Sequence, residues 1–315
     1  MDLRQIEYFV ALFEDGSVTR AAKRLNIVQS ALSMQIGRLE KELGQSLFER
    51  GPHGMSPTAA GGRTYQLFVP ILRDIADARE QLLHRESDVT GHVTLGVIAS
   101  MAESVLASAM ARFHERYPHV QVTISVGYSA TLIDWVSGGQ LDAAIINSPR
   151  SKLRLSTEPL LDEEMVLVTG QRQNSPLPAS VDLSRLQDYE LVLPTRRHGL
   201  RNMLDDAARQ AGVVLTPKFE IDALNAIVEL VTTTRFAAVL PSVVVQRAVR
   251  SGALNMCSIG SPPITRRVVR ICRAEQPLGA AVQALIDTIV SEIRGGSGIP
   301  GGSLAREPEA SNPGD

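Results

Sequence analysis

The stretch SVTRAAKRLNIVQSALSMQIGRLEKELGQSLFER, residues 17–50, decides the fold of the N-terminal part of the chain. It predicts a helix from about Val18 to Leu25, a tight turn at Asn26 and a second helix from about Gln29 to Leu43. Ser17 can cap the first helix with its hydroxyl, and Asn tolerates the left-handed backbone that such a turn needs. Apolar residues recur at three- and four-residue steps along the second helix and predict one buried side: Val28, Ala31, Leu32, Ile36, Leu39 and Leu43.

The opposite side of the second helix carries short polar side chains, one methionine and one cation. Such a face can read base edges in a major groove. No Asp or Glu occurs between Gly16 and Leu39, whereas several cations do, as phosphate binding requires. The alternative is an ordinary solvated helix in a small bundle. The predicted DNA-binding residues are Arg20, Lys23, Gln29, Ser30, Ser33, Met34, Gln35 and Arg38.

The segments MDLRQIEYFVALFEDGSVTRAAKRL, QSALSMQIGRLEKELG, LFER and SPTAAG resemble the winged helix-turn-helix of LysR-type transcriptional regulators over about the first sixty residues. The resemblance implies an all-α winged helix-turn-helix domain at residues 1–58, with its motif at about 18–37 and a short wing at 45–58. Arg50, at the base of the wing, is predicted to contact a phosphate or the minor groove. The alternative for Arg50 is a surface ion pair with Glu49 or Glu40.

The composition of the whole chain sets limits on its class. The 315 residues suffice for two or three compact units, 44% of them are hydrophobic, and the formal net charge is −2. Cys257 and Cys272 lie in apolar stretches, which predicts buried inert thiols in a reducing cytoplasm, with a redox pair as the alternative. We find no pattern of a signal peptide or a membrane span, and we expect residues 295–315 to be disordered.

Residues 59–89 predict one long helix with a heptad-like seam that needs a partner helix. The seam consists of Tyr65, Phe68, Leu72, Ile75 and Leu82. The alternative is a helix packed on its own domain. The LysR resemblance implies a linker helix that dimerises, hence a homodimer or homotetramer on double-stranded operator DNA with paired half-sites.

Residues 90–294 alternate between strand and helix patterns with short connections, which predicts a parallel α/β sheet. Segments such as GHVTLGV, RFHERYPHVQVTISVG, GGQLDAAI and LVLP before RRHGLR resemble the effector-binding domain of the same family. The resemblance implies a periplasmic-binding-protein-like fold of two Rossmann-like subdomains. Their expected bounds are 91–162 with 267–294, and 163–266.

Ligands in open α/β sheets bind beyond the carboxyl ends of the strands, near helix N-termini. The loops at those ends offer hydroxyls, an amide, a histidine and several arginines, which suit a small carboxylate held by the Arg201 guanidinium. The alternative for His198 and Arg201 is that they are solvated turn residues. Each Ser or Thr among them is equally a normal helix cap. The predicted effector-binding residues are Ser100, Met101, Ser129, Thr131, Asn147, Thr195, His198 and Arg201.

The leading interpretation is a DNA-binding regulator that responds to a small organic acid. A solute-binding protein with the same fold is the alternative. The chain contains no HExxH, GxSxG or P-loop motif and no GxGxxG after a strand, so we expect no enzyme activity, catalytic residue, metal or cofactor. Contact with RNA polymerase and the choice between activation and repression stay open.

Overall fold

The computed structural model describes residues 1–51, 54–83, 89–171, 177–260, 263–274 and 278–296. These form two compact units, Met1–His92 with Ser137–Gln140, and Val93–Val136 with the chain from Leu141 onward. None of the helices in the described ranges has the length and apolar character needed to cross a bilayer. The wing tip at Pro52-His53, the side chains of Arg50 and Leu82, and residues 297–315 lie outside what the structure describes.

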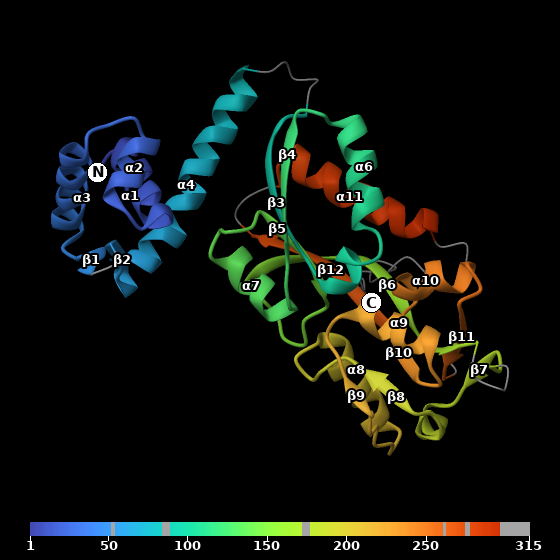
Figure 1. Cartoon of the computed structure of the whole chain (residues 1–315). Helices are drawn as coiled ribbons and strands as arrows, with labels where there is room; N and C mark the ends of the chain where they lie inside the picture. Colours follow the sequence, from blue (N-terminus) through green and yellow to red (C-terminus); the bar gives the residue numbers. More distant parts are fainter. Residues whose placement is uncertain (52–53, 84–88, 172–176, 261–262, 275–277, 297–315) are drawn as a thin grey trace, which may run out of the picture. The chain divides into compact units, whose positions relative to one another are not determined.

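The N-terminal unit is a helical bundle with a two-stranded wing (Figure 1). Its elements are α1 (Leu3–Asp15), α2 (Val18–Arg24), α3 (Gln29–Leu43), β1 (Phe48–Gly51), β2 (Gly54–Pro57) and α4 (Ala59–Leu83). The turn before α3 confirms the sequence prediction, since Asn26 is the only described non-glycine residue with a positive φ, 55°. Ser17 caps α2 by accepting a hydrogen bond from the Arg20 amide. The predicted helix, turn and helix are therefore confirmed.

The core of this unit forms around Phe9 of α1. The ring of Phe9 meets the ring of Phe68 from α4 edge to face at 5.6 Å and lies 5.3 Å from the ring of Phe48. Tyr65 of α4 stacks on Phe13 at 4.0 Å. Leu72 also packs against this core from the same helix. The first part of α4 is thus held by its own domain.

The second unit has two lobes that share two long strands (Figure 1). The first lobe contains β3 (Gly91–Val97), α5 (Ala99–Ala102), α6 (Leu106–Arg116), β4 (Val120–Val126), α7 (Ser129–Ser137), β5 (Ala143–Asn147) and α11 (Ala280–Gly296). The shared strands are β6 (Leu155–Gly170) and β12 (Thr265–Arg273). The second lobe contains β7 (Ser180–Val181), the 3-10 helix η1 (Leu183–Asp188), β8 (Leu191–Leu193), α8 (Gly199–Gln210), β9 (Phe219–Glu220), α9 (Leu224–Thr233), β10 (Ala237–Pro241), α10 (Ser242–Arg250) and β11 (Leu254–Ile259).

The strand order is β4-β3-β5-β12-β6-β10-β8-β9, with β11 pairing β6 and β7. Strands β3 and β5 are parallel, as are β10, β8 and β9. In contrast, β12 is antiparallel to both β5 and β6, and β10 is antiparallel to β6. The predicted parallel pairing therefore holds for strands within each lobe, whereas the strands that pass between the lobes pair antiparallel. The strand β6 is exposed at Ser156–Pro159 and fully buried from Met165 to Gly170, so its two ends have different surroundings.

Candidate functional site

The helix α3 presents a polar face opposite its buried side. Leu32, Ile36 and Leu39 point into the domain core. Gln29, Ser30, Met34 and Arg38 are exposed, and Ser33 is half-buried. These positions span one side of the helix at 100° per residue. The exposed face has the residues and the position that base reading would need.

The predicted DNA-binding residues are not equally free. The Gln35 side chain is half-buried, and its Oε1 accepts a hydrogen bond from Gln5 Nε2 at 3.2 Å. Arg24, which was not among them, forms ion pairs with Glu14 at 2.8 Å and with Asp15 at 3.2 Å. Arg20 donates to the Asp15 carbonyl. Within the described residues, Lys23 and Arg38 are exposed and have no ion pair, so their charge is available to phosphate.

A cavity of about 310 Å³ lies between the two lobes of the second unit. It lies beyond the carboxyl ends of β3, β4 and β5 in the first lobe and of β8 and β9 in the second. Its lining consists of Ile98, Ala99, Val126, Gly127, Tyr128, Ser129, Asn147, His198, Gly199, Asp222 and Ala223. The position agrees with the general rule for α/β ligand sites.

Of the predicted effector-binding residues, Ser129, Asn147 and His198 line this cavity, and the others do not. Ser100 is fully buried, and its Oγ accepts from Arg266 at 2.9 Å. Met101 belongs to the core. Thr131 is half-buried and does not line the cavity. Thr195 donates hydrogen bonds to Asp222 from both its amide and its hydroxyl.

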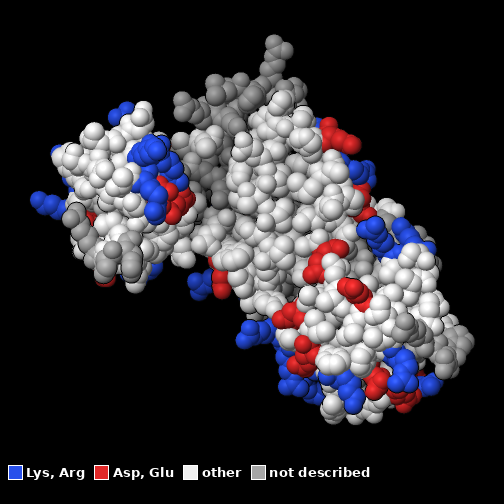
Figure 2. All heavy atoms as spheres, viewed as in Figure 1, with Lys and Arg blue, Asp and Glu red and all other residues white. Residues whose placement is uncertain are grey.

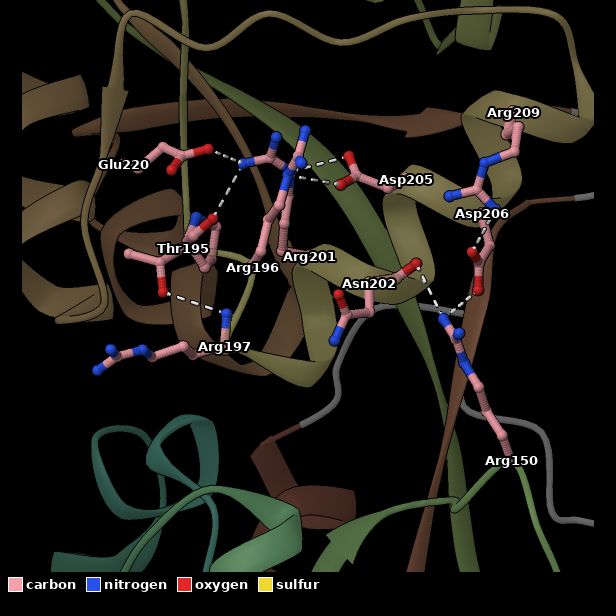
Figure 3. Close-up of polar contacts among 11 residues, drawn as sticks. Arg150, Thr195, Arg196, Arg197, Arg201, Asn202, Asp205, Asp206, Arg209 and Glu220 are labelled. Carbon is pink, nitrogen blue, oxygen red and sulfur yellow. Dashed lines mark hydrogen bonds and ion pairs between the residues drawn. The ribbon is translucent and has the colours of Figure 1, made fainter.

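Arg201 takes a structural role in place of the expected ligand contact. Its buried guanidinium contacts Asp205 at 2.8 Å and Glu220 at 2.6 Å, as Figure 3 shows, and it also donates to the Pro194 carbonyl. Burial acts to lower the pKa of Arg201, but the two carboxylates outweigh it and raise the pKa. With its donors directed at these partners, Arg201 is not available to hold a ligand carboxylate from the cavity.

His198 faces the cavity as a neutral ring. It is buried and is the N-cap of α8, where its Nδ1 accepts from the Leu200 amide at 3.4 Å. Burial, and then the nearby Arg266 charge, lower the pKa of His198 to about 4, against a smaller opposing effect of Asp222. Since Nδ1 is the acceptor, the proton of the neutral ring is on Nε2. His198 therefore offers an N–H donor at neutral pH.

Asp222 is a cavity residue that the sequence analysis did not single out. Burial acts to raise its pKa, but the hydrogen bonds from Thr195 and Tyr128 outweigh it and lower the pKa, so the carboxylate is ionised. Tyr128 Oη donates to Asp222 Oδ2 at 2.5 Å, and this bond raises the pKa of the phenol. Its position directly after β9 at the carboxyl edge of the sheet was a signal that could have identified it.

The lobes are joined across the cleft by further polar contacts. The Asn225 amide donates to Glu103 Oε2 at 2.7 Å. Arg150 of the first lobe pairs with Asp206 and donates to the Asn202 carbonyl on α8 (Figure 3). Together with the bond between Tyr128 and Asp222, these contacts join the two lobes.

A buried ion pair lies behind the cavity and was also missed. Arg266 of β12 contacts Glu163 of β6 at 2.5 Å, and both side chains are buried. Arg266 also donates to Asn147 Oδ1 at 3.1 Å. Arg266 has the same strand parity as the fully buried Val268, which is the sequence signal that could have placed it inside.

The charges on the surface of the second unit are unevenly spread. Residues 120–133, which include β4 and the start of α7, contain no charged residue. In Figure 2 the surface around β3 and β4 is accordingly almost white, whereas blue and red atoms gather at the end that carries α8 and β9. Among the lining residues in the described part of the chain, the acidic side chain, Asp222, likewise belongs to the second lobe.

Two domain families match the chain, one in each part, and both belong to LysR-type proteins. Residues 86–294 match the LysR substrate binding domain, and residues 3–62 match the bacterial regulatory helix-turn-helix protein, lysR family. The nitrogen assimilation regulatory protein nac of Klebsiella aerogenes is 29% identical over 297 residues, covering 92% of this chain and 95% of its own. A probable hydrogen peroxide-inducible genes activator of Streptomyces viridosporus is 28% identical over 294 residues, 93% of either chain.

Solved structures show the same fold. A full-length OxyR variant from Pseudomonas aeruginosa superposes with a TM-score of 0.73 at 25% identity, covering 92% of this chain and 98% of the other. Full-length CbnR in complex with its target DNA superposes with a TM-score of 0.65 at 20% identity, covering 94% and 100%. The likeness extends over both units of the chain.

Proposed function

Because the chain belongs to the LysR family of bacterial transcriptional regulators, we propose that it binds specific operator DNA and that a small effector in the interlobe cavity modulates this binding. The observation that carries the DNA part is the exposed polar face of α3, together with the exposed cations Lys23 and Arg38, which have no ion pair among the described residues. We assign DNA binding to residues 1–58, the linker to 59–89 and effector binding to 90–294.

The DNA-binding proposal separates base reading from phosphate contact. Gln29 and Ser33 lie on the exposed face of α3 and are assigned to base edges. Replacing either with Ala should cost about 1–3 kcal/mol at one base pair and leave other positions unchanged. Gln35 is assigned mainly to holding α3 against α1 through Gln5, so Gln35→Ala should lower stability more than specificity.

The test starts from duplexes selected from a random pool with the full-length protein. Fluorescence anisotropy then measures affinity across a salt series. Arg38→Ala should weaken all duplexes alike and reduce the slope of log K against log salt by about 1 for each protomer bound. Arg24→Ala is the control, because its charge is already neutralised by Glu14 and Asp15. If the selection yields no common sequence, or if the two arginine variants behave alike, the assignment is wrong.

The effector part of the proposal rests on the donors that face the cavity. Ser129 Oγ is buried and has no hydrogen-bond partner in the described part of the chain. His198 supplies an N–H, and the first turn of α7 supplies backbone N–H groups that have no partner within the helix. These groups fit the carboxylate of a small organic acid, without the guanidinium that the sequence had suggested.

The exposed apolar residues of the linker helix α4 support a homo-oligomer. Of the five residues of the predicted seam, Ile75 is among them. Tyr65, Phe68 and Leu72 face the core of their own domain, so the predicted seam is wrong for these positions. On the other side of α4, Leu67, Ile71 and Ile75 are exposed by 67%, 41% and 42%. Their four-residue spacing makes an apolar stripe, which we assign to a dimer contact that would pair two half-sites.

The name of one relative suggests a response to hydrogen peroxide. In this chain such a response cannot use a disulfide between Cys257 and Cys272, because the two residues lie too far apart. Cys257 lies opposite Leu167 on β6, and Cys272 lies opposite Ser156 on the same strand. At roughly 3.3 Å per residue these strand positions lie about 36 Å apart along β6, whereas a disulfide requires a Cα separation below about 7 Å. Both thiols are buried, and burial raises the pKa of Cys257. We therefore favour an effector ligand over a disulfide switch.

A further inference from the structure

The cavity presents an unused acceptor on its second lobe. Among its lining residues in the described chain, Asp222 is the one that carries a charge, since His198 is neutral. Its carboxylate accepts hydrogen bonds from the Thr195 amide at 3.2 Å, from Thr195 Oγ1 at 2.6 Å and from Tyr128 Oη at 2.5 Å. A carboxylate can accept about four hydrogen bonds. Asp222 therefore keeps room for one donor from a ligand.

The first lobe presents the complementary groups. Ser129 Oγ is buried without a hydrogen-bond partner at the start of α7, and Ser129 lines the cavity. The partial positive charge of the α7 N-terminus adds to this site. Between the donor side and Asp222, the walls are apolar and include Ile98, Val126 and Ala223. One small ligand that carries both an anionic and a cationic group would satisfy both sides.

We infer that the effector is a single α-amino acid with a small apolar side chain, its carboxylate at Ser129 and the first turn of α7 and its ammonium group at Asp222. The inference rests on the proposed effector role of this cavity. A simple carboxylic acid would bring a second negative charge beside Asp222, and a simple amine would leave Ser129 Oγ without a partner. The volume of about 310 Å³ lies at the small end of ligand sites and suits one amino acid.

Matched ligands test the inference with the full-length protein. Calorimetry would compare L-leucine with 4-methylpentanoate, which lacks the amino group, and with 3-methylbutylamine, which lacks the carboxylate. The same triplets would be run for valine and methionine. At least one amino acid should bind about tenfold or more tightly than both of its analogues. Equal binding of the acid that lacks the amino group, or no binding of any of these amino acids, would overturn the inference.

Matched variants locate the preference. Asp222→Asn should bring the affinities for the amino acid and its deaminated analogue close to each other. Glu103→Gln is the control, because Glu103 also joins the lobes, through the Asn225 amide, but does not line the cavity. The Glu103→Gln variant should prefer the amino acid over its deaminated analogue as strongly as the wild type does. Ser129→Ala should lower the affinities for the amino acid and for the deaminated acid by the same factor. A preference that persists in Asp222→Asn contradicts the inference, and the wild-type ligand series decides it if that variant does not fold.

The regulatory role is separated by measuring duplex affinity on the same preparations. If an amino acid binds with the predicted preference but leaves the affinity for selected DNA and the DNA bend unchanged, the proposed function fails and the ligand assignment stands. If 4-methylpentanoate binds as tightly as leucine and changes DNA affinity, the proposed function stands and the ligand assignment fails.

Discussion

Arg266 and Glu163 lie directly opposite each other on the antiparallel strands β12 and β6 and form a buried ion pair. The pair also connects the two lobes. Glu163 Oε1 accepts from the Val243 amide at the start of α10, at 2.8 Å, whereas Arg266 reaches Ser100 and Asn147 of the first lobe. This one pair of side chains thus links the two crossing strands to groups behind the interlobe cavity.

The Glu163→Gln variant should lower the free energy of unfolding by about 3–5 kcal/mol, because it leaves the Arg266 charge buried without its counter-charge. Urea unfolding of the full-length protein measures the change. Asp162→Asn is the control on the neighbouring position, since Asp162 pairs with the half-exposed Arg267 and its loss should cost about 0–1 kcal/mol. Similar losses in both variants would show that burial does not set the strength of this pair.

The stability of the second unit should fall as the pH falls from 6.5 to about 4 because of His198. The folded state keeps this histidine neutral down to about pH 4, whereas its ordinary pKa in the unfolded chain is 6.5. Between these values only the unfolded chain takes up the proton, which favours unfolding. The contribution is complete above pH 6.5 and is lost below about pH 4, for a maximum of about 3 kcal/mol.

The control for this pH effect is His198→Asn, which keeps a side chain able to cap α8 but removes the titrating group. Chemical unfolding of both proteins at pH values from 4 to 8 gives the difference between their stabilities. That difference should change with pH in the stated direction, and a difference independent of pH would contradict the assigned neutral state of His198.

Replacing Gly37 with Ala should stabilise the DNA-binding domain by about 0.5–1 kcal/mol. Gly37 is exposed inside α3, and a Cβ built there has no neighbouring atom within 4 Å. The gain comes from the higher helix propensity of Ala. Gly61→Ala in α4 should have the opposite effect. Its Cβ would lie 2.1 Å from the Leu47 carbonyl oxygen, so the substitution should destabilise the domain. Thermal unfolding of residues 1–83 within the intact protein, followed by hydrogen exchange, separates the two outcomes.

Ile71→Asp should dissociate the oligomer without unfolding the protomer, because it places a charge in the exposed stripe of Leu67, Ile71 and Ile75. Light scattering coupled to size-exclusion chromatography gives the mass. Gln66→Asp, at an exposed position beside the stripe, should leave the mass unchanged. By comparison, Leu72→Asp should destabilise the DNA-binding domain itself, since Leu72 packs on its core. A wild-type protein that is monomeric at micromolar concentration would refute the dimer contact.

Local patterns in the sequence were enough to predict most of the fold. The turn at Asn26, the wing and the alternation of strands and helices in the second unit follow from periodicity, capping and turn chemistry, which act over a few residues. The helix α10 and the strands β7 and β11 were not predicted. The position of the cavity followed from the same patterns, because the carboxyl ends of strands meet at one edge. Ser129, Asn147 and His198, which line the cavity, were placed at this edge in this way.

The partners of charged side chains could not be predicted in the same way. Arg266 and Glu163 are 103 residues apart in the chain, and only the tertiary fold shows that they meet. Arg201 looked like a ligand-binding cation until β9 brought Glu220 beside it. In α4 a heptad-like pattern marked Phe68 and Leu72 correctly as apolar contacts, but it could not tell a partner helix from the helix's own domain.

The two lobes share β6 and β12, which run from one lobe into the other as paired strands. Neither lobe can lose its central ladder without breaking hydrogen bonds that the other lobe also needs. The effector-binding part should therefore melt in one cooperative transition, with the slowest amide exchange in these two strands. If the cleft opens, the continuous strands β6 and β12 have to bend. We expect the bend at the irregular register between Val268 and Val269.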